Sequence, residues 1–379
     1  MNSLERREGR YQRRKAKREQ HRIEILERYN YESVICPDNL YKAMKDSRKG
    51  VYWKASVQRY NMNFLKNILR SHNDLVAEKD MRKGFICFDI VERGKPRHIC
   101  SVHFSERVVQ KSLCNNALIP HLTRSLIYDN GASIQDKGIH FAIERLKTHL
   151  RRHFKKHGRE GYVLLIDFKG YFDNIQHEPL RKIFNGAFGD DRRLLDLAMS
   201  FVYAFGEKGL GLGSETSQIA AVAYSSRNDH YIKEVLRCKH YGRYMDDSYF
   251  ICESKERAKH ILSAMLGKFA EIGIMTSPKK TQIIKLSRGF KFLKTHFSIE
   301  NTGRVVARPS RESATRQRRK LKKFKKFLDA GLMTMHDIRN SHMSWRGYIA
   351  HINSRRTVRN LDALYMQLFG VSPLIKIPI

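Results

Sequence analysis

The hydrophobic and polar positions of the chain follow two different periods, and each predicts a different kind of element. Between residues 38 and 75, apolar side chains recur at three- and four-residue intervals, which predicts helices. Residues 85–91 and 96–102 are apolar-rich runs on either side of a Gly-containing turn, so they predict a strand, a turn and a second strand. Further helices are expected at about 105–118 and 138–153. The pattern therefore predicts a mixture of helices and short strands.

One short apolar run, residues 161–166, ends at an acid, Asp167. A continuous apolar run of this length is typical of a buried strand. Farther along, Asp246 and Asp247 lie between two apolar segments, which predicts a β-hairpin with both acids at its tip. Adjacent acids repel each other, and a bound divalent cation relieves this repulsion. If the strand and the hairpin are neighbours, their carboxylates form a two-metal site for phosphoryl transfer. The alternative is two unrelated acidic turns on the surface.

The C-terminal part of the chain predicts a basic bundle of helices. Residues 304–326 hold eleven Lys or Arg and one acid, Glu312. Helical spacing is seen within and just after this segment at Leu321, Phe324, Phe327 and Leu328. Thr334 and Asp337 suggest a capping box at the start of a second helix, and a third helix is expected at about 356–369.

The net charge narrows the class of partner. The 379 residues include 73 Lys and Arg against 38 Asp and Glu, a formal net charge of +35. Such an excess of one sign calls for a polyanion, and nucleic acid is the expected one. Residues 1–28 carry ten Lys or Arg and five Glu, so they predict either a solvated basic helix or a frayed tail.

The remaining composition argues against a membrane and against a zinc ribbon. No run approaches the roughly 18 apolar residues of a membrane span, and the N-terminus lacks the apolar core of a signal peptide. We therefore expect a cytoplasmic protein. The six cysteines form no C-x-x-C pair, so we expect reduced thiols in the core rather than a zinc ribbon or knuckle.

The acid motifs together resemble those of the reverse transcriptase family. In that family, motif A carries an Asp-containing strand, here ending at Asp167, and motif C is a Tyr-x-Asp-Asp hairpin, here residues 244–247. The resemblance implies an α+β fold: a right-hand polymerase with fingers, an RRM-like palm of antiparallel sheet and helices, and a helical thumb. It also implies two Mg²⁺ ions shared by Asp167 and Asp246, with Asp247 as a weaker ligand and Phe168 contributing to metal and nucleotide binding.

Phe172 and a glycine-rich loop give the resemblance more detail. Phe172 lies five residues after Asp167, where the family places an aromatic steric gate that excludes the 2′-hydroxyl of ribonucleotides. Residues 209–218 correspond to motif B, with Gly213 and Gln218 expected at the nucleotide. Ser217 is a candidate N-cap for a helix starting near Gln218. The loop lacks the common Gln-Gly pair and resembles that of diversity-generating retroelements, which implies error-prone copying, notably opposite template adenine.

Basic residues complete the implied site. Arg97 resembles the fingers arginine that contacts the triphosphate, with Lys95 a weaker candidate, although an exposed hairpin charge is the alternative. Lys280 resembles the motif D lysine that protonates the leaving pyrophosphate. The basic helices resemble a thumb that grips duplex through its phosphates. The residues expected at nucleic acid there are Arg316, Arg318, Arg319, Lys322 and Lys323.

We expect four regions: a basic N-terminal extension (1–35), fingers with the start of the palm (36–160), the catalytic palm (161–300) and the thumb (301–379). The resemblance implies a prokaryotic enzyme whose partners are template RNA, primer, cDNA product, dNTPs and a small basic accessory protein. A diversity-generating role is the first hypothesis. A defence-associated reverse transcriptase is the second, and a non-catalytic RNA-binding protein that keeps the palm as a scaffold is the third.

Overall fold

The computed structural model describes residues 3–92 and 95–375, and of these the side chains of Ser3, Glu92, Lys95 and Arg97 lie outside the description. The chain forms two compact units that interleave in sequence. The first contains the chain up to Gln135 together with Phe168–Val235 and Met265–Thr276. The second contains Asp136–Asp167, Leu236–Ala264 and the chain from Ser277 onward.

The first unit is mainly helical and carries one two-stranded ribbon. Its helices and strands are α1 (Ser3–Arg28), α2 (Tyr31–Ile35), α3 (Pro37–Ser47), α4 (Ala55–Met62), α5 (Phe64–Val76), β1 (Phe85–Glu92), β2 (Lys95–Val102), α6 (Phe104–Leu113), α7 (Ile119–Thr123), α9 (His177–Phe188), α10 (Arg192–Tyr203), α11 (Glu215–Tyr224) and α12 (Ser226–His230). Short π-helical or 3₁₀ segments are η1 (Cys114–Leu118), η2 (Phe172–Asn174) and η3 (Tyr231–Val235).

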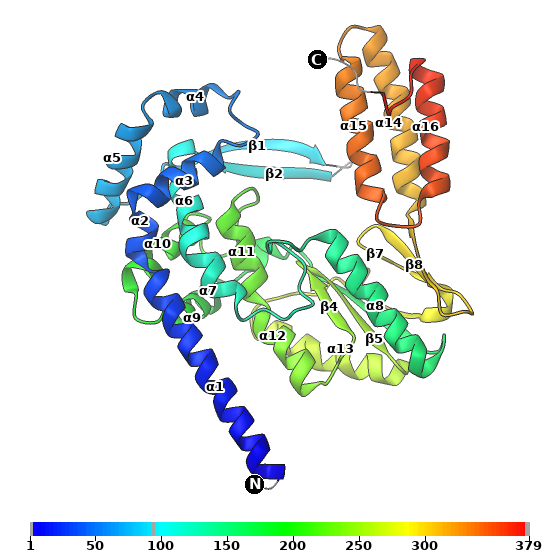
Figure 1. The fold of residues 1–379 in the computed structure, drawn as a ribbon, viewed down its shortest axis with the longest axis horizontal. Coiled ribbons are helices and arrows are strands. Elements are labelled where there is room, and N and C mark those ends of the chain that lie inside the picture. Colours follow the sequence, from blue (N-terminus) through cyan, green and yellow to red (C-terminus); the bar gives the residue numbers. More distant parts are fainter. Residues whose placement is uncertain (1–2, 93–94, 376–379) are drawn as a thin grey trace. The chain divides into compact units, whose positions relative to one another are not determined.

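The N-terminal segment is a helix, α1, which confirms the first of the two sequence-based alternatives. It extends as a single rod from the other helices of its unit (Figure 1). Strong helix formers dominate its sequence, and Gln12 donates to Glu8 Oε1 at 2.6 Å across one turn. Almost all of its side chains are exposed, so local propensity rather than packing accounts for most of its length.

The second unit contains two antiparallel sheets and four helices. Its elements are α8 (Ile139–His157), β3 (Tyr162–Asp167), β4 (Tyr241–Tyr244), β5 (Asp247–Cys252), β6 (Gln282–Lys285), η4 (Leu286–Arg288), β7 (Phe290–Phe292), β8 (Thr295–Ile299), β9 (Val305–Pro309), α14 (Arg311–Asp329), α15 (Met335–Ile349) and α16 (Arg355–Phe369). A further helix, α13 (Lys255–Ala270), begins in this unit and ends in the first.

The larger sheet has the strand order β4-β5-β3-β6, so β3 lies inside it. Val163 and Leu164 are fully buried and Ile166 is nearly so, which explains why the strand is apolar throughout rather than alternating. Leu146 and Leu150 of α8 pack with Val163 in one core that also includes Phe297 of the second sheet, β7-β8-β9. This core packs against β3, the strand that ends at Asp167.

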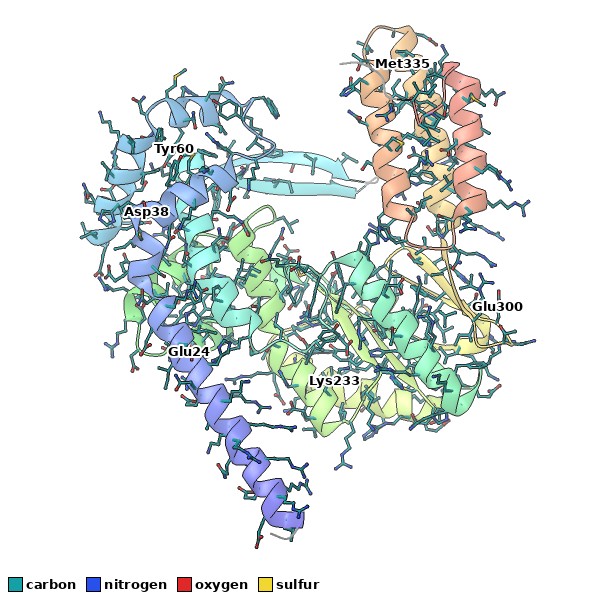
Figure 2. All side chains as sticks on the ribbon, viewed as in Figure 1. Glu24, Asp38, Tyr60, Lys233, Glu300 and Met335 are labelled. Atoms are coloured by element: carbon teal, nitrogen blue, oxygen red, sulfur yellow. The ribbon has the colours of Figure 1, made fainter. Side chains whose placement is uncertain are left out.

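The C-terminal helices α14, α15 and α16 form a bundle around a small core of Leu321, Phe324, Ile338, Leu361 and Tyr365 (Figure 1). Their apolar side chains gather between the helices (Figure 2). The predicted capping box is present at the start of α15: Asp337 N donates to Thr334 Oγ1 at 3.2 Å, and Thr334 N donates to Asp337 Oδ2 at 3.2 Å. The predicted helices of the basic C-terminal region are therefore confirmed.

Candidate active site

The strand pairing brings the two acid motifs together. In the antiparallel register of β3 and β5, Asp167 is the direct partner of Asp247. The neighbouring Ser248 is buried, and its hydroxyl donates to Ile166 O at 3.3 Å. The predicted strand and hairpin are thus confirmed as neighbours, and the alternative of two unrelated acidic turns is wrong.

The turn that carries Asp246 depends on a buried arginine that the sequence did not single out. Met245 has a left-handed backbone (φ 55°), which is uncommon for a residue with a side chain. The guanidinium of Arg243, 1% exposed, donates to Met245 O at 3.1 Å and so supports this conformation. Asp246 occupies the turn and Asp247 begins β5. The sequence offers no local signal for this burial, because a charged residue in a strand is usually exposed.

Lys280 lies against Asp167. Its ammonium donates to both carboxylate oxygens of Asp167, at 2.7 and 2.8 Å. The main chain holds the two residues together, because Ser277 N donates to Asp167 O at 2.8 Å and Lys280 N donates to Ser277 O at 3.1 Å. The resemblance to motif D named this lysine, and the structure places it at the acid cluster.

The neighbouring carboxylates affect the ionisation of Asp247. Burial raises the pKa of Asp247 to about 7, with further contributions from the carboxylates of Asp246 and Asp167. The ion pair with Asp167 raises the pKa of Lys280, which keeps this ammonium protonated at neutral pH. The Lys280 ammonium attracts all three carboxylates, and a bound cation would relieve the repulsion between them further.

The donor set fits Mg²⁺. Asp167, Asp246 and Asp247 offer carboxylate oxygens, the hard ligands that Mg²⁺ prefers. The raised pKa of Asp247 indicates that a cation bound beside it would favour its ionised form. Asp167 would have to share its carboxylate between such a cation and the Lys280 ammonium, which donates to both of its oxygens.

Phe168, unlike the three acids of the predicted ligand set, has its side chain in the hydrophobic core. Its side chain is 3% exposed and packs against the rings of Tyr171 and Phe269, with centroid distances of 5.1 and 4.8 Å. The ring is therefore a core element, which leaves only the main chain of Phe168 for a role in metal or nucleotide binding.

In the first unit, the segment around Phe172 and the motif B loop are joined by main-chain hydrogen bonds. Leu210 N donates to Phe172 O at 2.8 Å, and Gly209 N donates to Ile175 O at 2.8 Å. The preceding tyrosine is anchored as well, since Tyr171 Oη donates to Ala221 O of α11 at 2.7 Å. These bonds leave the Phe172 ring half-buried beside the loop.

The motif B residues lie at the start of α11. Gly213 has a φ of 105°, and a Cβ built there would lie 3.4 Å from Ile99 Cγ2 of β2. Gln218 is exposed and accepts a hydrogen bond from Ser133 Oγ at 3.3 Å. The expectation that Ser217 caps the helix is wrong: the N-cap is Ser214, and Ser217 is buried inside the helix.

Arg97 is described only by its main chain, which lies in β2 opposite Ile90. Its side chain, like that of Lys95, falls outside the described residues, so its predicted contact with the triphosphate stays a prediction.

The thumb residues expected at nucleic acid share one helix. Exposed side chains along α14 include Arg316, Arg318, Arg319, Lys322 and Lys323. The opposite stripe of α14 packs into the bundle through Gln317, Leu321 and Phe324. In the same unit, a cavity of about 980 Å³ is lined by Lys147, Arg304, Arg355, Arg356 and Arg359, among others. This second basic surface could not be recognised from the sequence, because its residues come from three separate segments.

Three features agree with a polymerase palm: the paired strands β3 and β5, the hairpin that carries Asp246 and Asp247, and Lys280 beside Asp167. Residues 71–297 match the family described as Reverse transcriptase (RNA-dependent DNA polymerase), and the chain belongs to this family. The match confirms the predicted family of RNA-directed DNA polymerases, and the antiparallel sheets with surrounding helices confirm the predicted α+β fold class. No curated protein matches the sequence.

Solved structures similar to the chain include fungal telomerases. Apo telomerase from Candida tropicalis truncated from its C-terminal domain is 16% identical, with 58% of this chain and 54% of that chain covered and a TM-score of 0.44. Telomerase from Candida albicans in complex with the TWJ fragment of telomeric RNA is 12% identical, with 76% and 57% covered and a TM-score of 0.49. Apo telomerase from Candida tropicalis is 14% identical, with 76% and 59% covered and a TM-score of 0.48. The chain thus spans between 54% and 59% of these telomerase chains.

None of the helices in the described part of the chain combines the length and the apolar composition that a bilayer span requires.

Proposed function

We propose that this chain copies a retroelement RNA into cDNA by two-metal nucleotidyl transfer. The observation that carries the proposal is the register pair of Asp167 and Asp247, with Asp246 in the adjoining turn and Lys280 on Asp167. The test is primer extension by the purified protein on an RNA template, with dNTPs and Mg²⁺. Labelled DNA product that depends on the template, the primer and Mg²⁺ supports the proposal, and its absence contradicts it.

In the proposed reaction the primer 3′-oxygen bonds to the α-phosphorus of the incoming nucleotide, and the bond to pyrophosphate breaks. Two Mg²⁺ ions, when bound, lower the pKa of the primer hydroxyl and stabilise the charge on the leaving group. Asp167 and Asp246 would hold these ions, with Asp247 supporting them. Lys280, kept protonated by the carboxylate beside it, would give a proton to the departing pyrophosphate.

We propose further that the protein belongs to a diversity-generating retroelement. The motif B loop supports this, because it reads Leu212-Gly213 where most reverse transcriptases have Gln-Gly. Gly213 lies against Ile99 of the β1–β2 ribbon, and Leu210 of the same loop is hydrogen-bonded to Phe172. The loop therefore contacts both the strand that carries Arg97 and the segment that carries the expected steric gate. A small basic accessory protein and a prokaryotic cytoplasm belong to the same prediction. A defence-associated reverse transcriptase is the alternative, and the neighbouring genes would distinguish the two.

The fidelity of copying tests the diversity-generating role. We expect frequent misincorporation opposite template adenine, because a loop without the Gln side chain constrains the template base less. Leu212→Gln restores the Gln-Gly pair while keeping Gly213, whose left-handed backbone needs glycine, and should change the error spectrum. The measurement is sequencing of cDNA made by the purified enzyme with any accessory protein from its operon.

Leu212→Ala is the matched control, since it removes the same side chain without adding an amide. If Ala and Gln variants shift the errors equally, loss of Leu212 rather than gain of Gln is responsible. An error rate at adenine no higher than at the other three bases would exclude the diversity-generating role and favour the defence alternative.

The basic face of α14 predicts binding that weakens steeply with salt. Each phosphate contact contributes a slope of about 0.7–0.9 in log K against log salt. Replacing Arg318, Arg319, Lys322 and Lys323 by Gln should flatten that slope and reduce processivity, because these side chains are exposed along one helix. The measurement is RNA–DNA duplex affinity across a salt series.

The control removes the same number of charges from exposed positions of α8 by changing Arg151, Arg152, Lys155 and Lys156 to Gln. The thumb variant should lose more of the salt dependence than this control. Equal losses would show that net charge, rather than the face of α14, determines binding.

A further inference from the structure

The β1–β2 ribbon is a two-stranded sheet with an exposed apolar side. Its sheet has two strands, and Ile86, Phe88 and Ile90 are between 41% and 54% exposed. A two-stranded hairpin is at best marginally stable in water without further support. An additional cross-link between its strands would therefore have a clear structural effect.

The register of the ribbon gathers three metal-ligating side chains on one face. Cys87 pairs with Cys100, and two residues along, Asp89 pairs with His98. Because side chains two apart on a strand share a face, all four lie together. The ligand atoms of Cys87, His98 and Cys100 all lie within 4.8 Å of one another, and within the described ranges no other group of His, Cys, Asp and Glu side chains does this.

The detailed contacts suit a soft divalent ion. The sulfur atoms of Cys87 and Cys100 are 3.1 Å apart. Asp89 Oδ1 lies 2.9 Å from His98 Nδ1, so a metal bound by this histidine would use the second ring nitrogen, Nε2. A carboxylate on the second ring nitrogen is the usual companion of a metal-bound histidine, because it fixes the ring and raises its basicity.

We propose that Cys87, His98 and Cys100 bind Zn²⁺, with Asp89 orienting the histidine and water completing the coordination. Two sulfurs and one imidazole nitrogen are typical zinc ligands, whereas Mg²⁺ prefers oxygen. Binding releases the two thiol protons to solvent and involves no redox change. Zn–S bonds of about 2.3 Å in a tetrahedral site put the sulfurs roughly 3.8 Å apart, so these side chains need only a small outward rotation.

The site would clamp the middle of the ribbon. It joins β1 to β2 at the residue next to Arg97, so it would fix the register of the strand on which that predicted triphosphate contact lies. The expectation that the cysteines are core thiols is wrong for Cys87, which is exposed, although Cys114, Cys238 and Cys252 are buried. The ligand pair was not recognised from the sequence because the cysteines are 13 residues apart and meet only through strand pairing.

The test measures zinc directly. Full-length reduced protein, dialysed against trace Zn²⁺, should retain one Zn²⁺ per chain by elemental analysis, and Co²⁺ loading should give the intense visible bands of tetrahedral thiolate coordination. Cys87→Ser and Cys100→Ser should each abolish both signals. Asp89→Asn should weaken zinc binding by roughly 10–100-fold while the cobalt spectrum keeps its thiolate bands.

Cys36→Ser, a cysteine outside the ribbon, is the matched control and should bind zinc as the wild type does. Three results would overturn the proposal. They are the absence of zinc in the reduced protein, equal loss of zinc in the Cys36→Ser variant, and a Cys87–Cys100 disulfide that persists under the reducing conditions of the assay. Because the ligands are exposed or half-buried, the circular dichroism of each variant without zinc should match that of the zinc-free wild type, which separates loss of the site from unfolding.

Discussion

Asp246→Asn is expected to reduce primer extension by about 10³-fold or more while RNA binding stays close to that of the wild type. The substitution removes one carboxylate charge beside Asp247, the register partner of Asp167, and a metal ligand contributes several kcal/mol of transition-state stabilisation. Binding should persist because Asn fits the same turn, and because the positive charge expected to hold RNA lies elsewhere. Single-turnover extension and filter binding of the same preparation measure the two quantities.

The matched control for this prediction is Glu253→Gln, which neutralises an exposed carboxylate just beyond the opposite end of β5. It should extend primers at the wild-type rate. A wild-type rate in Asp246→Asn would show that the site assignment is wrong. A wild-type protein that binds RNA but never extends a primer would instead support the non-catalytic RNA-binding hypothesis.

The elements around this site could be predicted because their signals are local. The apolar run at 161–166 identified a buried strand, and Asp246 and Asp247 between two apolar segments identified a hairpin. Likewise Thr334 and Asp337 marked the start of α15, because a capping box needs only residues three apart. Each of these features follows from period, turn chemistry or capping within a few residues.

The contacts between elements could not be predicted in the same way. Lys280 meets Asp167 across 113 residues of sequence, and only the resemblance to motif D suggested that the two belong to one site. Arg243 is a charged residue in a strand, and nothing in its neighbourhood says that it will be buried beneath the turn. These positions depend on how distant segments pack.

The prediction that Ser217 caps the motif B helix was wrong because of the backbone conformation of a nearby glycine. Ser214, Thr216 and Ser217 were all chemically able to cap a helix. Gly213 has a positive φ and cannot belong to the helix, so the first extended residue after it, Ser214, becomes the N-cap. Glu215 then lies in the first turn, where its charge favours the helix dipole.

Phe172→Ala is expected to let the enzyme use ribonucleotides. The proposed role of the ring is to occupy the space of a 2′-hydroxyl. Contacts of both the backbone and the ring of Phe172 restrict its position. The carbonyl of Phe172 accepts from Leu210 N at 2.8 Å, and its ring packs edge-on to Tyr171 at a centroid distance of 6.1 Å. Since the backbone is fixed by the motif B loop, removing the ring should open space rather than shift the segment.

The expected change in sugar preference is moderate, because dNTPs and rNTPs differ by a single hydroxyl group. Pocket contacts of one or a few atoms change substrate discrimination by roughly 10–200-fold, so the preference for dNTPs over rNTPs should fall by about that factor in Phe172→Ala and by less in Phe172→Val. The measurement is the ratio of kcat/KM for matched dNTP and rNTP on one template. Phe172→Tyr, which keeps the ring, is the control and should retain the wild-type ratio. An unchanged ratio in Phe172→Ala, with DNA synthesis intact, would place the sugar gate at another residue.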